Sequence, residues 1–441
     1  MSASFFDGFA GFAAAPATAL PIPARLVASA WELLEVSAHD AFGSHEVCAG
    51  LSYTALVREA SRVADLFVRD GLAPGARVAV LVPLGQTWLA AAFGAWKAGL
   101  AVCVDVCADV SADAGADGPA GAAPVLDAAV VDSAALTRLL TSGAEMPARI
   151  YVTDFTGPIP PGLLDFEAEA PSAAAPPALA TAVAFTRGGL AATHAQLLAG
   201  LAGLQDRLRL RAPARVLAPA SAEDPSWPVA ALLLPVAAGA TIVFGGNRSA
   251  AALAELIRTQ SISHAFPDLA LLVELAIPRA PEPSARPPRG AAAEILGGTL
   301  GGLAELLATR LTPEHALTRA VAGLQGNVES ARATGLEALV TTSTDPRLAE
   351  LMALGLPILR AWAPPGALGF ATLQDGLPPR ADSLGRPLRG VEVTALAPDA
   401  SGVGALVVSG PAFGGTLQTQ VRGRIDASLH VLAATPAGGT A

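Results

Sequence analysis

Residues 51–106 carry the repeating pattern that most restricts the fold of this chain, "LSYTALVREASRVADLFVRDGLAPGARVAVLVPLGQTWLAAAFGAWKAGLAVCVDV". Apolar residues from Leu56 to Phe67 recur at the spacing of one helical face, and Gly71 is placed to end that helix. The apolar strand "ARVAVLV" follows, then a helix in "TWLAAAFGAWKAG", then a second strand in "AVCVDV". This order of strand, helix and strand predicts a parallel sheet with helices on its faces.

The same alternation continues along most of the chain. The stretches "DAAVVDS", "RIYVTDF" and "ARVLAPA" are typical of buried strands, and "WPVAALLLPVAAGATIVF" predicts a helix followed by a strand. Residues 108–124, 157–180 and 278–290 have the biased compositions of loops. From Ser383 onward, short strands separated by turns predict a small β subdomain.

We therefore expect an α/β chain in three parts. An N-terminal arm and a first αβ half would occupy residues 1–180, a second αβ half residues 181–382, and a small β subdomain with a tail residues 383–441. The chain has 441 residues, of which 52% are hydrophobic. It is long enough to bury a large core and too long for one compact unit of ordinary size.

Composition and charge argue against several classes of function. The formal net charge is −10 and no basic block is present, so nucleic acid and membranes are poor partners. No clean apolar run is long enough to span a bilayer, and the N-terminal stretch lacks a basic residue before Arg25, so we expect no signal peptide and a cytoplasmic protein. The three cysteines, Cys48, Cys103 and Cys107, suit a reducing compartment and are expected in the core.

Lysine and histidine limit the chemistry that the chain can carry out. Lys97 is the only lysine among 28 Lys and Arg residues, so a mechanism that needs a lysine must use it. We expect no metal site and no hydrolase triad, because the histidines show no H-E-x-x-H spacing and no G-x-S-x-G elbow is present. The six histidines are His39, His45, His194, His264, His315 and His430.

The stretch "AVAFTRGGLAATHAQLLAG" (182–200) predicts a buried strand, a tight glycine turn and a helix that opens at Thr193 and His194. A strand, a glycine turn and a helix in sequence form a common site for phosphate. This turn, however, is very short and contains no lysine. We expect His194 to be a satisfied histidine at the helix start rather than a general base.

The order of these segments resembles the large N-terminal domain of the adenylate-forming superfamily, which includes acyl-CoA and aryl-CoA ligases and peptide-synthetase adenylation domains. The block 51–99 is similar to the family's L-T-Y-x-E-L … G-D-R-V-A-V … K-A-G pattern, and "LLLPVAAGATIVF" resembles its L-x-x-G-A-x-x-V helix end. "SLGRPLRGVEVTAL" and "GALVVSGPAFGG" resemble two later blocks. The resemblance implies two αβ halves and a small β-barrel-like subdomain, with the family's small C-terminal domain absent.

The resemblance also locates the expected nucleotide site, in a degraded form. The family's T-S-G-T-T-G-x-P-K-G-V-x-x-T-H turn wraps the phosphates of ATP. Here the corresponding turn is shorter and keeps only Thr186, Arg187, Gly188 and Gly189 as remnants. Backbone N–H groups and a cation are needed to hold a polyphosphate. We expect this trimmed turn not to enclose a triphosphate, with residual anion binding at Arg187 as the lesser alternative.

The family's other nucleotide motifs are altered as well. Its Y-G-x-T-E falls on "AWAPPGAL", with Trp362 at the Tyr and with Pro365 and Gly366 in place of the Thr and Glu that support phosphate and Mg²⁺. Pro and Gly offer no side-chain ligand to a metal. The family's T-G-D, whose Asp holds the ribose, falls on Thr419-Gln420-Val421, and Asp426 is expected to be a turn residue.

Two further features suggest binding rather than chemistry. The segment "SAEDPSWP" lies where CoA ligases line the acyl pocket, so Asp224, Trp227 and Trp362 are candidate pocket residues, with a solvated loop as the plainer reading of 221–228. The segment "RLRLRAP" (207–213) is expected to be a surface helix end, with contact to a carrier protein as the alternative.

Two main hypotheses follow. The first is a non-catalytic homologue without catalytic residues, metal or cofactor, which binds an acyl or aryl group, a carrier protein or a partner ligase or synthase of a biosynthetic pathway. The second is a diverged AMP-forming acid–thiol ligase that uses ATP and Mg²⁺ and is completed by a separate C-terminal domain. A third alternative is a decaying gene product with no partner. We favour the first, because four separated nucleotide features are degraded while the fold-bearing blocks persist.

Overall fold

A computed structural model describes residues 20–434 apart from 105–125, 143–144, 156, 170–181, 188–189, 223, 247, 277–335, 344, 346–347, 354–355, 366, 375–379 and 381–382. Gly188, Gly189 and Gly366 of the expected nucleotide site lie outside the described residues, as do Cys107 and the expected loops 108–124 and 278–290. None of the helices in the described part is both long and apolar enough to cross a membrane.

The first sheet has seven strands in the order β7-β6-β5-β3-β4-β8-β9. All its neighbouring strands are parallel except β8 and β9. All residues of β4 and β5 are buried, as expected for strands covered on both faces. The parallel strands predicted within 51–106 are therefore confirmed. The strand bounds are β3 Arg77–Val80, β4 Ala101–Cys103, β5 Ala128–Val131, β6 Arg149–Val152, β7 Leu164–Asp165, β8 Val183–Arg187 and β9 Leu190–Thr193.

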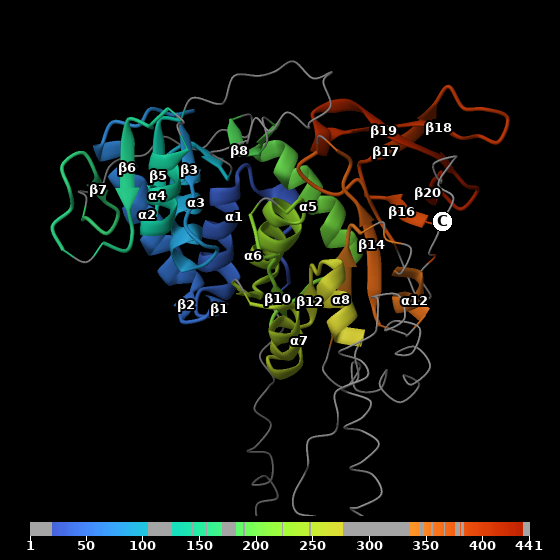
Figure 1. Cartoon of the computed structure of the whole chain (residues 1–441), viewed down its shortest axis with the longest axis horizontal. Coiled ribbons are helices and arrows are strands. Elements are labelled where there is room, and N and C mark those ends of the chain that lie inside the picture. Colours follow the sequence, from blue (N-terminus) through green and yellow to red (C-terminus); the bar gives the residue numbers. More distant parts are fainter. Residues whose placement is uncertain are drawn as a thin grey trace, which may run out of the picture.

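The second sheet has eleven strands in the order β11-β10-β12-β13-β14-β15-β16-β20-β19-β18-β17. The strands from β11 to β14 pair in parallel, and all later pairs are antiparallel. The bounds are β10 Arg215–Leu217, β11 Thr241–Val243, β12 His264–Ala265, β13 Ala338–Thr341, β14 Ile358–Trp362, β15 Thr372–Leu373, β16 Ser383–Pro387, β17 Glu392–Leu396, β18 Gly404–Gly410, β19 Gly415–Ile425 and β20 Val431–Ala433. Figure 1 shows the antiparallel strands β17 to β19, in red, projecting at one end of the molecule.

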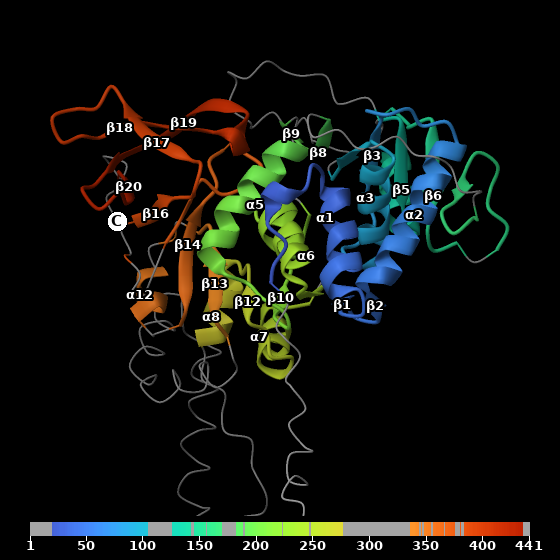
Figure 2. The same ribbon diagram turned by 180° about the vertical axis from the view of Figure 1, so that it is seen from behind.

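Helices fill the space between the two sheets (Figures 1 and 2). Helix α1 contacts α3 on the side of the first sheet and α5 and α6 on the side of the second. A short antiparallel pair, β1 (Glu46–Cys48) and β2 (Leu51–Ser52), precedes α2. The remaining bounds are η1 Ala24–Leu26, α1 Ala30–Val36, η2 Ser37–Phe42, α2 Tyr53–Arg69, α3 Gln86–Lys97, α4 Ser133–Thr141, α5 His194–Leu208, η3 Trp227–Leu233, α6 Leu234–Ala238, α7 Ala250–Thr259, α8 Leu269–Ala276, α12 Leu348–Ala353 and η5 Pro411–Phe413.

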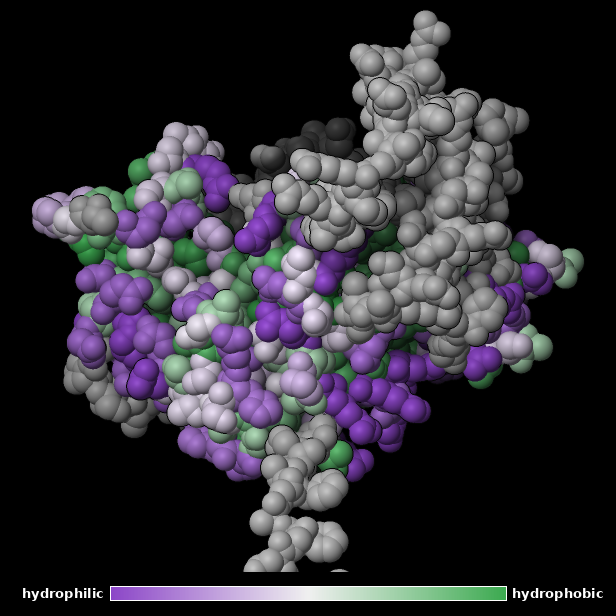
Figure 3. Space-filling view, turned by 90° about the horizontal axis from the view of Figure 1, so that it is seen from below, coloured by the Kyte–Doolittle hydropathy of each residue, from purple (hydrophilic) through white to green (hydrophobic). Residues whose placement is uncertain are grey.

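The main core is this helical layer together with the sheet faces that it touches. One continuous cluster of buried apolar side chains runs through α1, α2, α3, α5, η3 and α6 and reaches both sheets. Burial of the layer from both sides explains why the sequence around α3 and α6 is apolar on every side, unlike an amphipathic surface helix. Figure 3 shows hydrophilic side chains dispersed over the face seen from below. The expected α/β fold with mainly parallel sheets is confirmed.

The segment 182–200 differs from its predicted form. The sequence suggested that the helix follows the glycine turn directly, but a strand, β9, lies between them. Arg187 pairs with Leu190 across the turn, so β8 and β9 form a hairpin with two residues between the paired positions. The run "LAAT" was too short and too Ala-rich to be identified as a strand, because its pairing with β8 decides its conformation.

The close contact between α2 and α3 depends on a glycine, Gly94, which has no side chain. A Cβ atom at Gly94 would lie 2.7 Å from Val63 Cγ1 and 2.9 Å from the backbone oxygen of Ala60. By contrast, a Cβ atom at Gly200 in α5 would meet Val229 at 3.6 Å, an ordinary contact. Of these two helical glycines, Gly94 lacks room for a methyl group and Gly200 has it.

We predict that Gly94→Ala lowers the free energy of unfolding by about 2 kcal/mol, because α2 and α3 must move apart. Gly200→Ala is the matched control and should raise it by about 0.5–1 kcal/mol through helix propensity. Urea unfolding followed by circular dichroism measures both. Equal effects of the two substitutions would contradict the close packing at Gly94.

Candidate functional site

The β8–β9 hairpin, which stands where the phosphate-binding turn was expected, has its side chains engaged by the protein itself. The Thr186 hydroxyl lies 2.8 Å from Cys103 Sγ in the neighbouring strand β4. The Arg187 guanidinium donates to the backbone oxygen of Ala367 at 3.0 Å and is half-buried. The hairpin is thereby fastened to the segment that follows β14.

That segment is the one on which the family's Mg²⁺ motif falls. Trp362, the last residue of β14, is 6% exposed and packs with Leu384, Leu406 and Val408 in the core of the antiparallel strands. Pro365 is exposed in the turn that follows. Trp362 therefore serves as a core residue at the junction of the parallel and antiparallel parts.

The expected ribose site is part of β19. Thr419 is buried, and its hydroxyl donates to the backbone oxygen of Leu406 at 2.8 Å. Val421 is half-buried and has no polar side-chain atom at the position of the family's Asp. These residues maintain the sheet and provide no carboxylate for a sugar.

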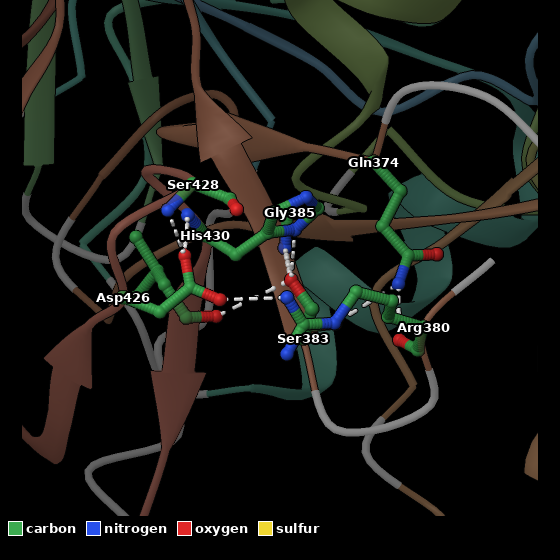
Figure 4. A network of polar contacts seen from close by, with 8 residues as sticks. Gln374, Arg380, Ser383, Gly385, Asp426, Ser428 and His430 are labelled. Carbon is green, nitrogen blue, oxygen red and sulfur yellow. Dashed lines mark hydrogen bonds and ion pairs between the residues drawn. The ribbon is translucent and has the colours of Figure 1, made fainter.

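Asp426 belongs to a polar network that closes the antiparallel part of the sheet (Figure 4). Its Oδ2 accepts from Arg380 at 2.6 Å, and its Oδ1 accepts from the backbone N–H groups of Ser428 and His430. The Arg380 guanidinium, with the N–H of His430 next in importance, lowers the pKa of Asp426 to about 2. The expectation that Asp426 is a turn residue is confirmed.

The same network contains a serine and a histidine that the sequence analysis did not connect. Ser383 Oγ lies 2.8 Å from His430 Nδ1, and it accepts from the N–H of Gly385 at 2.9 Å. Ser383 is fully buried, so a substrate has no access to its hydroxyl. The carboxylate of Asp426 bonds the backbone of His430 rather than its ring (Figure 4). This arrangement is structural and not a catalytic triad.

The two candidate acyl-pocket residues near η3 have local roles. Asp224 Oδ1 accepts from the N–H and the hydroxyl of Ser226, which fixes the turn before the helix. Trp227 is fully buried, and its ring packs edge-on against Trp88 with 5.1 Å between centroids and lies 6.2 Å from Phe244. Trp227 thus supports two aromatic residues that line a cavity.

The cavity has a volume of about 590 Å³ and lies where strands of both sheets end. The segments that follow β3, β4, β5, β10 and β11 contribute to its wall, and Trp88 and Phe244 contribute aromatic faces. Sequence reasoning missed the cavity because these segments are far apart in the chain. The available signal was that these strands are parallel, since their carboxyl ends then meet at one edge.

Lys97 and His194 are held in the helical layer. Lys97 Nζ donates to Ser61 Oγ at 2.7 Å and lies 4.9 Å from the centre of the Trp31 ring. His194 is 1% exposed, and its Nδ1 accepts from the backbone N–H of Ala30 at 3.2 Å. Burial lowers the pKa of His194 to about 4, so the ring is neutral at pH 7. Both side chains join neighbouring helices of this layer.

Within the described part of the chain, no three His, Cys, Asp or Glu side chains gather as metal ligands. Cys48 and Cys103 are buried, and burial raises the pKa of the Cys48 thiol to about 12, so it stays protonated.

Comparison with known proteins agrees with this architecture. Residues 38–185 match the family of AMP-binding enzymes. Among solved structures, the chain is similar to a benzoate CoA ligase from Burkholderia xenovorans, with a TM-score of 0.66 and 15% identity over 92% of this chain and 79% of that one. A protein assigned as a long-chain-fatty-acid CoA ligase from Rhodopseudomonas palustris gives a TM-score of 0.65 at 18% identity, covering 92% and 98% of the two chains.

The N-terminal domain of FACL13 from Mycobacterium tuberculosis is matched over its whole length, with 92% of this chain covered, a TM-score of 0.63 and 15% identity. A comparison of the sequence with curated proteins finds no match. The chain therefore has the N-terminal-domain fold of the adenylate-forming superfamily. The match at residues 38–185 and this fold agree with the resemblance that the sequence blocks suggested.

The buried histidine yields a prediction about pH. The pKa of His194 in the folded chain, about 4, lies below its ordinary value of 6.5, so the unfolded chain binds more protons between these values. Its contribution to stability is full above about pH 6.5 and is lost as the pH falls toward 4. From pH 7 to pH 5 the loss from this group is about 2 kcal/mol.

We predict that His194→Asn, which keeps an acceptor for the Ala30 N–H but does not titrate, reduces the loss of stability between pH 7 and pH 5 by this amount. Urea unfolding at the two pH values measures it. His39→Asn, at an exposed histidine, is the control and should leave the pH dependence unchanged. If His194→Asn and the unmodified chain lose the same stability between pH 7 and pH 5, other groups account for that loss.

Proposed function

We propose that this chain is a non-adenylating member of the superfamily that acts by binding. Its ligand would be an acyl or aryl group, and its partners a carrier protein or an active ligase or synthase in a biosynthetic pathway. Loss of nucleotide chemistry while the scaffold is kept favours a binding role over an enzymatic one. The substrate itself is not identified by the fold.

The observation that carries the proposal is the hydrogen bond from Arg187 to the backbone oxygen of Ala367. It joins the hairpin to the segment after β14, the two places between which the family holds nucleotide phosphates. A guanidinium committed to a carbonyl of the same chain is a poor substitute for a mobile lysine that follows phosphate charge.

The neighbouring groups support the same conclusion. A hairpin with two residues between Arg187 and Leu190 offers few backbone N–H groups to a polyphosphate. Thr186 is bonded to Cys103, and Thr419 to the backbone of Leu406. Neither Pro365 nor Val421 has a side-chain oxygen for Mg²⁺ or ribose. The residues present do not fit ATP and Mg²⁺, and we derive no reaction step through them.

The test is direct. In calorimetry with ATP and Mg²⁺ at millimolar concentrations, we expect no saturable heat. In ATP–pyrophosphate exchange with a panel of aromatic and aliphatic acids, we expect no signal above the protein-free blank. An active ligase of the superfamily, assayed in parallel, controls for the reagents. Robust Mg²⁺-dependent exchange would overturn the proposal and favour the diverged ligase, as would exchange that arises when a separate C-terminal domain is added.

Arg187 itself gives a second prediction. Arg187→Gln should lower the free energy of unfolding by about 1–2 kcal/mol, because the carbonyl of the buried residue Ala367 loses a charged donor. The variant should leave the response to ATP and to inorganic phosphate unchanged. Arg424→Gln, at an exposed arginine of β19, is the control for loss of charge. A phosphate affinity that falls in Arg187→Gln, with stability unaltered, would instead make Arg187 an anion ligand.

A further inference from the structure

Strand β17, at one end of the eleven-stranded sheet, has an open outer edge. Its five residues, Glu392–Leu396, pair one to one with β18 and without a bulge. Among the described elements, β17 packs chiefly against β18 and β19, and these strands project from the body of the molecule (Figure 1). In the part of the chain that the structure describes, no strand therefore pairs with the backbone N–H and C=O groups on the far side of β17.

The other end strands of the two large sheets are shorter than β17. Strand β11 has three residues and contacts β1, where Thr241 Oγ1 donates to the backbone oxygen of Glu46 at 2.9 Å. Strand β7 has two residues, and β9 has four and leads directly into α5. Proteins usually keep end strands short or covered, because unpaired backbone groups can accept a strand from another chain. Strand β17, the longest of the four, is therefore the edge best able to do so.

The sequence of β17, "EVTAL", suits a further strand pairing. It includes two β-branched residues, Val393 and Thr394, and lacks the Pro and Lys that often protect an edge. Its one charge is at the first position, Glu392. Leu396, at the other end, is 50% exposed although it is a large apolar residue. A strand beside β17 would remove part of this apolar surface from water.

The order of side chains along β17 is complementary to itself. In an antiparallel pair centred on Thr394, all five residues overlap, Thr394 faces the partner's Thr394, and Glu392 faces the partner's Leu396. No like charges then face each other, and the stem of Glu392 covers apolar surface. Opposite residues of such a pair lie on the same face of a sheet, so the side of β17 that contains the buried Val393 stays on the side of the core.

The charges beside β17 agree with an antiparallel orientation. Arg389 precedes the strand and Asp399 follows it, and their side chains are 71% and 51% exposed, although each has an ion-pair partner in its own copy. Antiparallel pairing brings the start of one strand toward the end of the other, so these opposite charges approach each other. Exposed ion pairs add little to affinity, but this pair favours the orientation.

We propose that two copies of this chain associate through β17, in an antiparallel pair with two-fold symmetry that continues the eleven-stranded sheet from one copy into the other. The inference goes beyond the proposed function, since it rests only on the open edge and the self-complementary sequence of β17. Five residue pairs bury less surface than a standard protein interface, so the dimer is reversible and of micromolar affinity.

The experiment is sedimentation equilibrium of the full chain. From about 2 to about 200 µM, a dimer with a Kd on the order of 20 µM passes from mostly monomer to mostly dimer. Thr394→Lys places two ammonium groups opposite each other at the symmetry axis and should weaken the dimer at least about tenfold. Gln418→Lys is the matched control and should leave the dimer unchanged. Gln418 is exposed in β19, in the same cross-strand row as Thr394 through Val407 but away from the edge.

A mixing experiment separates loss of the interface from damage to the fold. Thr394→Glu should also be monomeric by itself, whereas an equimolar mixture of Thr394→Lys and Thr394→Glu should form dimers again, because opposite charges then meet at the axis. Circular dichroism of each variant verifies its fold before mixing. A chain that stays monomeric up to the highest concentration would overturn the proposal. Equal association of Thr394→Lys and Gln418→Lys would do so too, as would a mixture that remains monomeric.

Discussion

The structure depends on the burial of one helical layer between two sheets. Helix α1 touches α3 on one side and α5 and α6 on the other, and the apolar cluster of this layer continues into both sheets. The tight crossing at Gly94 and the hydrogen bond from the Ala30 backbone to His194 belong to the same layer. The free energy gained by hydrophobic burial is proportional to the apolar area removed from water. A layer that is buried on both sides therefore stabilises the parts of the chain that contain the two sheets at once. The scaffold can therefore persist while the surface loops that it carries change.

The proposed loss of nucleotide binding is compatible with this separation of scaffold and loops. The groups that hold the core lie in helices and strands, whereas the phosphate, Mg²⁺ and ribose motifs fall on the β8–β9 hairpin, the turn after β14 and strand β19. In the hairpin and in β19 the polar side chains bond the protein itself, as Thr186 does with Cys103 and Thr419 with Leu406. The polar groups are satisfied locally, so the fold incurs no cost of unpaired buried atoms there.

The sequence was sufficient to predict the architecture, but not the arrangement of the residues at the candidate site. Helical periodicity and apolar strands located β3, α3 and β4 because those signals are local. Strand β9 was not predicted from the sequence, because its pairing with β8, and not its own composition, makes "LAAT" extended. The sequence also could not say that Trp362 points into the antiparallel core, since the buried face of a strand depends on its neighbours. The cavity could not be predicted for the same reason, because its wall is assembled from segments that are far apart in the chain.

The single lysine has a consequence for the surface of the molecule. Lys97 is bonded to Ser61 and lies over the Trp31 ring, so its amine is partly shielded on two sides. The other residues among the 28 Lys and Arg are arginines, whose guanidinium stays charged at any pH that proteins tolerate. Acylating reagents and amine-directed cross-linkers therefore meet one shielded side-chain target, and alkaline conditions leave the positive charge of the surface intact.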